Sequence, residues 1–380
     1  MKLKKLFAGI VAVAMMATMG ATSVFATEKA PVVPTAPTNK QVSIKKVITG
    51  NGYGSETVKL EVDNNGNAVA VYHTALTTDK APTISIPDAE KDGITITAPT
   101  APATTAEGTL HIKLNDYNRV GTYVYKFHEV AGSTAGMTYA SNSKWLVVNV
   151  YNDVDENSKE IKPNSDLLVN AVVVSQDPTH ALESETRTEL VKIDHIDNEY
   201  NAGTYTVKKL VKGNMSDRQK EFNFKVTFEK AENATIPGIK LGNDTLELTT
   251  WNDITTPSGE KKKVATYEFT LTHGGEKKFE NIPYGVTVSV VELTDNKDDL
   301  TNTNGKLTNG EYEVTYKDNS NAATEINKGN ASVTATIINA STVNVNTGVI
   351  LDNAPYIALL TIVAAGAVVM IMKKRRNYED

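Results

Sequence analysis

The stretch Ile44-Lys-Lys-Val-Ile-Thr-Gly50 returns later in the chain as Val207-Lys-Lys-Leu-Val-Lys-Gly213. Each copy alternates apolar and polar side chains with the period of two that is typical of a half-buried β-strand. Each copy also opens a block of similar short runs that is long enough for one domain. We therefore predict an internal repeat, with one domain in residues 40–202 and a second in residues 203–343.

The runs within both blocks indicate an all-β fold. They are short, rich in β-branched and aromatic residues, and free of long helical periodicity, as in residues 122–127, 145–151, 222–228 and 286–291. Turn signals such as Asn51-Gly52, Asn65-Gly66 and Asn309-Gly310 separate them. Many short strands joined by such turns predict two tandem antiparallel β-sandwiches with an Ig-like layout.

Two lysines fall on strand faces that are otherwise apolar. Successive side chains of a strand point to opposite sides of the sheet, so every second residue shares a face. Lys46 alternates with Val42, Ile44 and Ile48, and Lys209 alternates with Tyr205, Val207 and Val211. Their neighbours Lys45 and Lys208 fall on the wetter face. We therefore expect each domain to point one lysine into its core.

A carboxylate and a carboxamide follow the same pattern in each block. Glu129 ends a face formed by Tyr123, Tyr125 and Phe127, and Glu292 ends a face formed by Val286, Val288 and Val290. Asn198 alternates with Ile196 and Tyr200, and Asn339 alternates with Val333, Ala335 and Ile337. Each block thus carries Lys on its first strand, Glu in its middle and Asn on its last strand.

These three residue types can form a covalent bond in a dry core. Burial disfavours the charged forms of lysine and glutamate. A neutral amine is a nucleophile, and a protonated Glu can polarise a carboxamide and relay protons as ammonia leaves. We predict two such amides, Lys46–Asn198 assisted by Glu129 and Lys209–Asn339 assisted by Glu292. For a single trio a Lys–Glu ion pair beside an Asn is the simpler alternative, and the repetition favours the bond.

The N-terminal 26 residues are typical of a secretory signal peptide. Lys2, Lys4 and Lys5 precede an apolar stretch over residues 6–19, and the segment ends with the small residue Ala26. Residues 27–39 are rich in proline and lack an apolar pattern, which predicts a flexible leader. We expect the chain to be secreted.

The tail, residues 344–380, carries a second targeting pattern. It begins with Asn-Val-Asn-Thr-Gly and continues with an apolar run over residues 354–372 and the basic Lys373-Lys-Arg-Arg376. The run can cross a hydrocarbon core of ~30 Å as a helix, and the basic residues favour the cytoplasmic side. The tail resembles a Gram-positive cell-wall sorting signal, in which a sortase cuts between Thr and Gly, here Thr347 and Gly348. A plain C-terminal membrane anchor is the alternative.

Composition excludes several classes of function. The net charge is −6, and the basic residues form no stripe with interleaved aromatics, so nucleic acid is not an expected partner. Cysteine is absent, so this secreted chain has no disulfides to stiffen it. The residues form no evident metal, nucleotide or Ser/His/Asp constellation, so we expect no cofactor, no bound metal and no enzyme that acts on an external substrate.

The signal peptide, the doubled trio and the tail together resemble the Gram-positive major (backbone) pilins, most closely the two-domain streptococcal T-antigen type. The resemblance is carried by the opening strands at residues 44–46 and 207–209, by the strands that end in Glu129 and Glu292, by the closing Asn198 and Asn339, and by the tail residues 353–359. It implies Ig-like domains of the CnaB type with internal Lys–Asn isopeptide bonds.

The resemblance also implies a covalent polymer. In this family a pilus-specific sortase joins the Thr of the sorting signal, here Thr347, to a lysine of the next subunit. Lys192 lies close to the place of that lysine, and Lys162 is the alternative. The implied partners are the sortase, further copies in a head-to-tail chain, minor pilins and peptidoglycan, and the implied location is a pilus anchored to the cell wall. A singly wall-anchored adhesin is the rival interpretation, and a surface enzyme with β-sandwich domains is a more distant one.

Overall fold

The fold is described from a computed structural model that covers residues 40–163, 165–183, 190–242, 247–303, 305–319 and 321–343. The expected signal peptide, leader and tail lie outside these residues, and so do Thr347, Gly348 and the apolar run 354–372. Within the ranges described, no helix is both long enough and apolar enough to cross a bilayer.

The described chain is almost entirely β, as predicted, and its first half forms two sheets. One sheet has the order β4-β6-β1-β12-β8. Its strands are β4 (Ile84–Ser85), β6 (Thr105–Leu114), β1 (Gln41–Thr49), β12 (His195–Tyr200) and β8 (Met137–Thr138). The other has the order β11-β10-β9-β7-β2-β5, with β3 also paired to β7. Its strands are β11 (Lys192–Ile193), β10 (Leu167–Val174), β9 (Lys144–Asn152), β7 (Gly121–Val130), β2 (Ser55–Val62), β5 (Ile94–Thr97) and β3 (Ala70–Tyr72).

The second half repeats this two-sheet arrangement. One sheet has the order β16-β15-β19-β13-β25-β23-β22-β21. Its strands are β16 (Glu247–Leu248), β15 (Ile239–Lys240), β19 (Glu276–Pro283), β13 (Ala202–Lys212), β25 (Ser332–Ser341), β23 (Tyr312–Tyr316), β22 (Lys306–Asn309) and β21 (Thr301–Thr303). The other sheet has the order β17-β18-β14-β20-β24. Its strands are β17 (Asn252–Thr255), β18 (Lys261–Leu271), β14 (Phe222–Ala231), β20 (Thr287–Leu293) and β24 (Thr324–Glu325).

Helical structure is minor in the described ranges. It consists of one short helix and isolated 3₁₀ turns, namely α2 (Thr179–Glu183), η2 (Asp63–Gly66), η3 (Thr78–Lys80), η4 (Asp88–Glu90) and η5 (Lys317–Asn319). In η2 the Asn64-Asn65-Gly66 segment has positive φ at all three residues, which fits the turn signal read there from the sequence.

In both halves the opening strand pairs in parallel with the closing strand. Strand β1 pairs with β12 so that Ile48 lies opposite Asn198. Strand β13 pairs with β25 so that Val211 lies opposite Asn339. Each asparagine is therefore opposite the residue two positions after the buried lysine of its half. Because side chains alternate along a strand, lysine and asparagine project diagonally from the same face.

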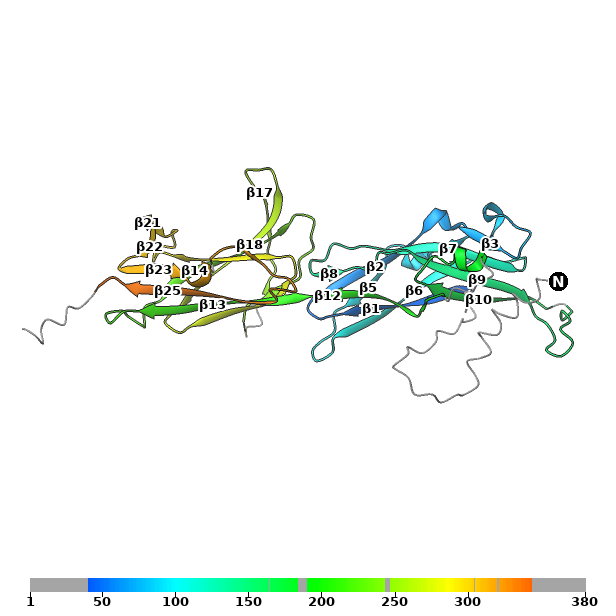
Figure 1. The fold of residues 1–380 in the computed structure, drawn as a ribbon, viewed down its shortest axis with the longest axis horizontal. Helices are drawn as coiled ribbons and strands as arrows, with labels where there is room; N and C mark the ends of the chain where they lie inside the picture. Colours follow the sequence, from blue (N-terminus) through cyan, green and yellow to red (C-terminus); the bar gives the residue numbers. More distant parts are fainter. Residues whose placement is uncertain are drawn as a thin grey trace, which may run out of the picture.

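The two sandwiches lie end to end, and β12 runs almost directly into β13 (Figure 1). Each has its own apolar core, and Asn201 is the single residue between β12 and β13. Asn281 of the second sandwich connects to the first sandwich through two hydrogen bonds. Its Nδ2 donates to the carbonyl oxygen of Gly52 at 2.8 Å, and its Oδ1 accepts from the Tyr200 hydroxyl at 3.1 Å. Gly52 has positive φ, and a Cβ there would lie 2.4 Å from Asn281 Oδ1, so glycine is required at this contact.

Candidate functional site

Lys46, Glu129 and Asn198 meet inside the first sandwich. Lys46 and Asn198 project from neighbouring strands β1 and β12, and Glu129 projects toward them from β7 in the facing sheet. The Lys46 Nζ lies 2.7 Å from Glu129 Oε2, and Asn198 Nδ2 donates to Glu129 Oε1 at 2.5 Å. The three residues are at most 1% exposed. One carboxylate thus bridges the amine and the carboxamide.

Lys209, Glu292 and Asn339 form the same arrangement in the second sandwich. The Lys209 Nζ lies 2.7 Å from Glu292 Oε2, and Asn339 Nδ2 donates to Glu292 Oε1 at 2.7 Å. These residues are also at most 1% exposed. The lysine and the glutamate are 83 positions apart in both halves. We call each group of Lys, Glu and Asn a triad. The expectation that all six side chains face the cores agrees with the structure, while the bonds stay predictions.

The carboxamide oxygens of the two triads have different surroundings. In the first triad the backbone N–H of Ala140 donates to Asn198 Oδ1 at 2.9 Å. In the second triad Asn339 Oδ1 is buried and has no hydrogen-bond partner among the described residues. Sequence reasoning missed Ala140, because a backbone donor from a loop leaves no signal in residue types.

Each triad also has a polar neighbour that the sequence analysis did not assign. Lys144 on β9 is buried beside the first triad, where its positive charge acts on Lys46 and Glu129. Its Nζ donates to the carbonyl oxygen of Asn142 at 2.7 Å. In the second triad Asn309 donates through Nδ2 to Glu292 Oε1 at 2.8 Å, so two carboxamides share one carboxylate oxygen. The sequence of the Asn309-Gly310 pair predicts only a turn.

Burial lowers the pKa of both triad lysines. Desolvation is the main cause for Lys46, where the carboxylate of Glu129 opposes the shift and the charge of Lys144 adds to it. Desolvation lowers the pKa of Lys209 to about 8, again against the effect of its glutamate. The Lys209 Nζ also lies 4.1 Å from the ring centroid of Phe222, a cation–π contact that favours its charged form.

The geometry of both triads suits a proton relay between nucleophile and leaving group. Oε2 of the acid contacts the lysine nitrogen, and Oε1 contacts the amide nitrogen that would leave as ammonia. This differs from the expectation that the acid polarises the carboxamide oxygen. In the first triad the physical reason is clear, since the Ala140 N–H already occupies that oxygen and turns the NH₂ group toward Glu129.

The two candidate linking lysines lie in different places. Lys192 is half-buried on the edge strand β11, opposite Val174 of β10. It has no ion-pair partner among the residues described. Lys162 is exposed in the connection between β9 and β10, where its Nζ lies 2.9 Å from Asp153 Oδ1. This connection is at the end of the first sandwich that faces away from the second (Figure 1). Both positions stay candidates for an intersubunit bond.

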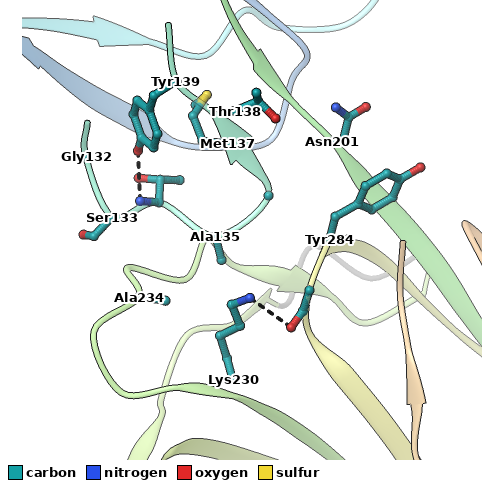
Figure 2. Close-up of a pocket in the computed structure, with 13 residues that line it drawn as sticks. Gly132, Ser133, Ala135, Met137, Thr138, Tyr139, Asn201, Lys230, Ala234 and Tyr284 are labelled. Atoms are coloured by element: carbon teal, nitrogen blue, oxygen red, sulfur yellow. Dashed lines mark hydrogen bonds between the residues drawn. The ribbon is translucent and has the colours of Figure 1, made fainter. Parts of the chain in front are cut away.

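A pocket of about 500 Å³ lies between the sandwiches, away from both triads. Figure 2 shows the Gly132–Tyr139 segment on one side and Lys230 with Tyr284 on the other. The Lys230 amine donates to the carbonyl oxygen of Gly285 at 3.0 Å. The Thr134 N–H donates to the Tyr139 hydroxyl at 2.9 Å, as drawn in Figure 2. The pocket therefore belongs to the junction between the sandwiches.

Comparison with known proteins supports the expected family. A curated protein named "Pilin" from Streptococcus pyogenes serotype M1 is 28% identical over 265 residues, which are 68% of this chain and 69% of that protein. The chain is therefore similar to a streptococcal pilin. A family model described as a domain of unknown function, DUF7601, matches residues 203–341, which is nearly the whole second sandwich.

Solved structures of S. pyogenes major pilins are also similar to this chain. The T3.2 major pilin is 17% identical with a TM-score of 0.39, and another S. pyogenes major pilin is 19% identical with a TM-score of 0.40. In both comparisons the match covers 80% of this chain and 99% of the pilin.

Proposed function

We propose that this protein is the structural backbone subunit of a covalently assembled cell-surface pilus. Each sandwich would be an Ig-like domain of the CnaB type, closed by an internal amide, Lys46–Asn198 in residues 40–202 and Lys209–Asn339 in residues 203–343. The observation that carries the proposal is the doubled triad. Two buried Lys–Glu–Asn groups share one strand register and one Lys-to-Glu spacing. The pilin relative supports the same assignment.

The bond would tie the first strand of each domain to its last strand. Pulling force on a parallel pair of terminal strands loads the hydrogen bonds between them, and an amide across that pair carries the force through a covalent link. In a chain without cysteine, this crosslink would take the place of a disulfide. A structural polymer subunit needs no cofactor and no external substrate.

Intact mass tests the internal bonds directly. The purified ectodomain is expected to weigh less than its sequence by two molecules of ammonia, and peptide mapping is expected to find Lys46 joined to Asn198 and Lys209 joined to Asn339. Lys45 and Lys208, on the same strands, have side chains that are 48% and 40% exposed, and they serve as internal controls that should form no amide. A mass equal to the sequence mass would refute the proposed bonds.

Assembly would join Thr347 of one subunit to a lysine of the next through a pilus-specific sortase, followed by attachment to peptidoglycan. Cells that express the chain with its native sortase are expected to yield a ladder of multimers in boiling detergent. Lys192→Ala should abolish the ladder and leave the monomer attached to the wall, while Lys162→Ala should keep it. The reverse result would move the linkage to Lys162. Absence of a ladder from the parent chain would favour the singly anchored adhesin.

A further inference from the structure

The segment that follows β8 places a backbone donor on the reacting carboxamide of the first triad. Ala140 N–H donates to Asn198 Oδ1 at 2.9 Å, so a hydrogen-bond donor already lies on the oxygen that would become the oxyanion. In attack by an amine on a carboxamide carbon, negative charge develops on this oxygen. A donor aimed at that atom before the reaction stabilises the transition state more than the ground state.

The donor is held in place by the segment that precedes it in the chain. Strand β8 pairs with the strand that carries Asn198, with Thr138 opposite Glu199 and Met137 opposite Tyr200. The next residue, Tyr139, donates its hydroxyl to the buried carboxylate of Glu56 at 3.0 Å. Thr134 donates to the same carboxylate at 2.6 Å. The Ala140 N–H is therefore fixed relative to Asn198 by a sheet ladder and by a buried anchor.

We propose that the Ala140 N–H is a catalytic oxyanion donor for the first amide bond, and that the second domain closes its bond without an equivalent donor. This inference rests on the proposed function. Its second half rests on Asn339 Oδ1, which is buried and unpartnered among the described residues. The two domains would thus make the same bond, one with a backbone donor to the carboxamide oxygen and one without.

The first-domain reaction balances as follows. Lys46 passes one proton to Glu129 and attacks Cγ of Asn198 as a neutral amine, so a bond forms between Nζ and Cγ. The carbonyl electron pair moves to Oδ1, where it accepts from the Ala140 N–H. Glu129 gives its proton to Nδ2 and takes the second proton from Nζ. The bond between Cγ and Nδ2 then breaks, and ammonia leaves with the remaining proton as ammonium.

The test removes the N–H and leaves the side chains intact. An ester in place of the Tyr139–Ala140 amide removes this donor and keeps every side chain, and Ala140→Pro is the genetically encoded version. Ala140→Gly keeps the N–H and is the matched control. Full-length chain is made by cell-free synthesis and quenched in acid at intervals. Peptide mapping then measures how fast each bond forms. The rate of the second-domain bond is the internal reference for the rate of the first-domain bond.

The ester is expected to slow the first-domain bond by about 100- to 1000-fold, the usual effect of losing one oxyanion donor, and to leave the second-domain rate unchanged. An unchanged first-domain rate would overturn the inference. The ester is also placed in a Lys46→Ala chain, where no first bond forms. Loss of folding there would assign the N–H a structural role and equally overturn it. If the parent chain forms neither bond, the proposed function fails instead.

Discussion

The two triads share their side chains, spacing and burial, yet they differ at the atom where charge would develop. In the first domain the carboxamide oxygen has a backbone donor, and a second buried lysine lies nearby. In the second domain the oxygen has no partner among the described residues, and a second carboxamide contacts the acid instead. Under the proposed function, the repeated side chains would specify the bond, whereas the residues around them would decide how each domain reaches it.

The largest expected effect comes from losing one crosslink. Asn198→Ala and Asn339→Ala each remove one electrophile but keep the Lys–Glu ion pair, so the buried charges stay compensated. Closing a loop of more than 100 residues is worth about 4–5 kcal/mol in the chain-entropy treatment of disulfides. Calorimetry of each variant should show one domain unfolding at a clearly lower temperature. Intact mass should show one ammonia loss fewer than in the parent chain. Glu199→Ala, on the exposed face of β12, is the control that should change neither.

The same pair of variants tests whether the two sites are equivalent. Asn198→Ala also leaves the Ala140 N–H without its acceptor, which costs about 1–3 kcal/mol if no water replaces it. Asn339→Ala removes a buried oxygen that had no partner. The first-domain variant should therefore lose more stability than the second-domain variant. Equal losses would contradict the difference that the structure shows between the two oxygens.

A second contrast comes from removing the acid. Gln cannot relay protons, and general acid–base catalysis contributes about 10²–10⁴-fold to rates. Glu129→Gln should slow formation of the first-domain bond. Because the Ala140 N–H still donates to Asn198 Oδ1, this bond should still form over long incubation. Glu292→Gln should leave the second domain open over the same time. Time-resolved peptide mapping measures both.

The exposed ion pairs offer matched controls for this experiment. Glu107 pairs with Lys45 on β1, and Glu276 pairs with Lys208 on β13. Glu107→Gln and Glu276→Gln should leave both bond-forming rates unchanged. If the second-domain bond in Glu292→Gln forms as fast as the first-domain bond in Glu129→Gln, the two glutamates contribute equally to the rates, and the proposed difference between the domains is wrong.

Much of the fold and the members of both triads could be predicted from the sequence, because alternation with period two reports which side chains face a core. Lys144 could have been found in the same way, since it shares a face with Leu146, Val148 and Val150 on β9. The predicted strand begins at Trp145, so Lys144 falls just before the alternation that the sequence shows.

Other features depend on tertiary structure that one sequence does not encode locally. The parallel register of β1 with β12, which sets Asn198 opposite Ile48, is a long-range pairing. The Ala140 N–H is a main-chain group, and any residue except proline supplies one. Asn309 belongs to a predicted turn, and the turn does follow β22, but the Asn309 side chain also donates to Glu292. The Asn-Gly sequence accounts for the turn, but it gives no sign of the contact between Asn309 and Glu292.

The smallest expected effect is the pH dependence of the second bond. Burial lowers the pKa of Lys209 from 10.5 to about 8, and attack needs the neutral amine. The neutral fraction then rises about tenfold between pH 7 and pH 9 and changes little above that. The rate of second-domain closure should follow this curve in the cell-free assay. A rate that keeps rising toward pH 10.5 would mean that Lys209 reacts before it is buried.

The pKa of Lys209 can also be checked at equilibrium, in a variant whose second domain cannot form its amide. The quantity measured is the free energy of unfolding of that domain. In Asn339→Ala the unfolded lysine binds a proton up to about pH 10.5, while the folded lysine releases it near pH 8. Between these values the unfolded state holds more protons, so the free energy of unfolding should rise with pH in this window. Lys209→Met in the same background removes the titrating group and should flatten the curve. If the curve is already flat in Asn339→Ala, the lysine keeps its ordinary pKa in the folded domain, and the tenfold rate effect would need another cause.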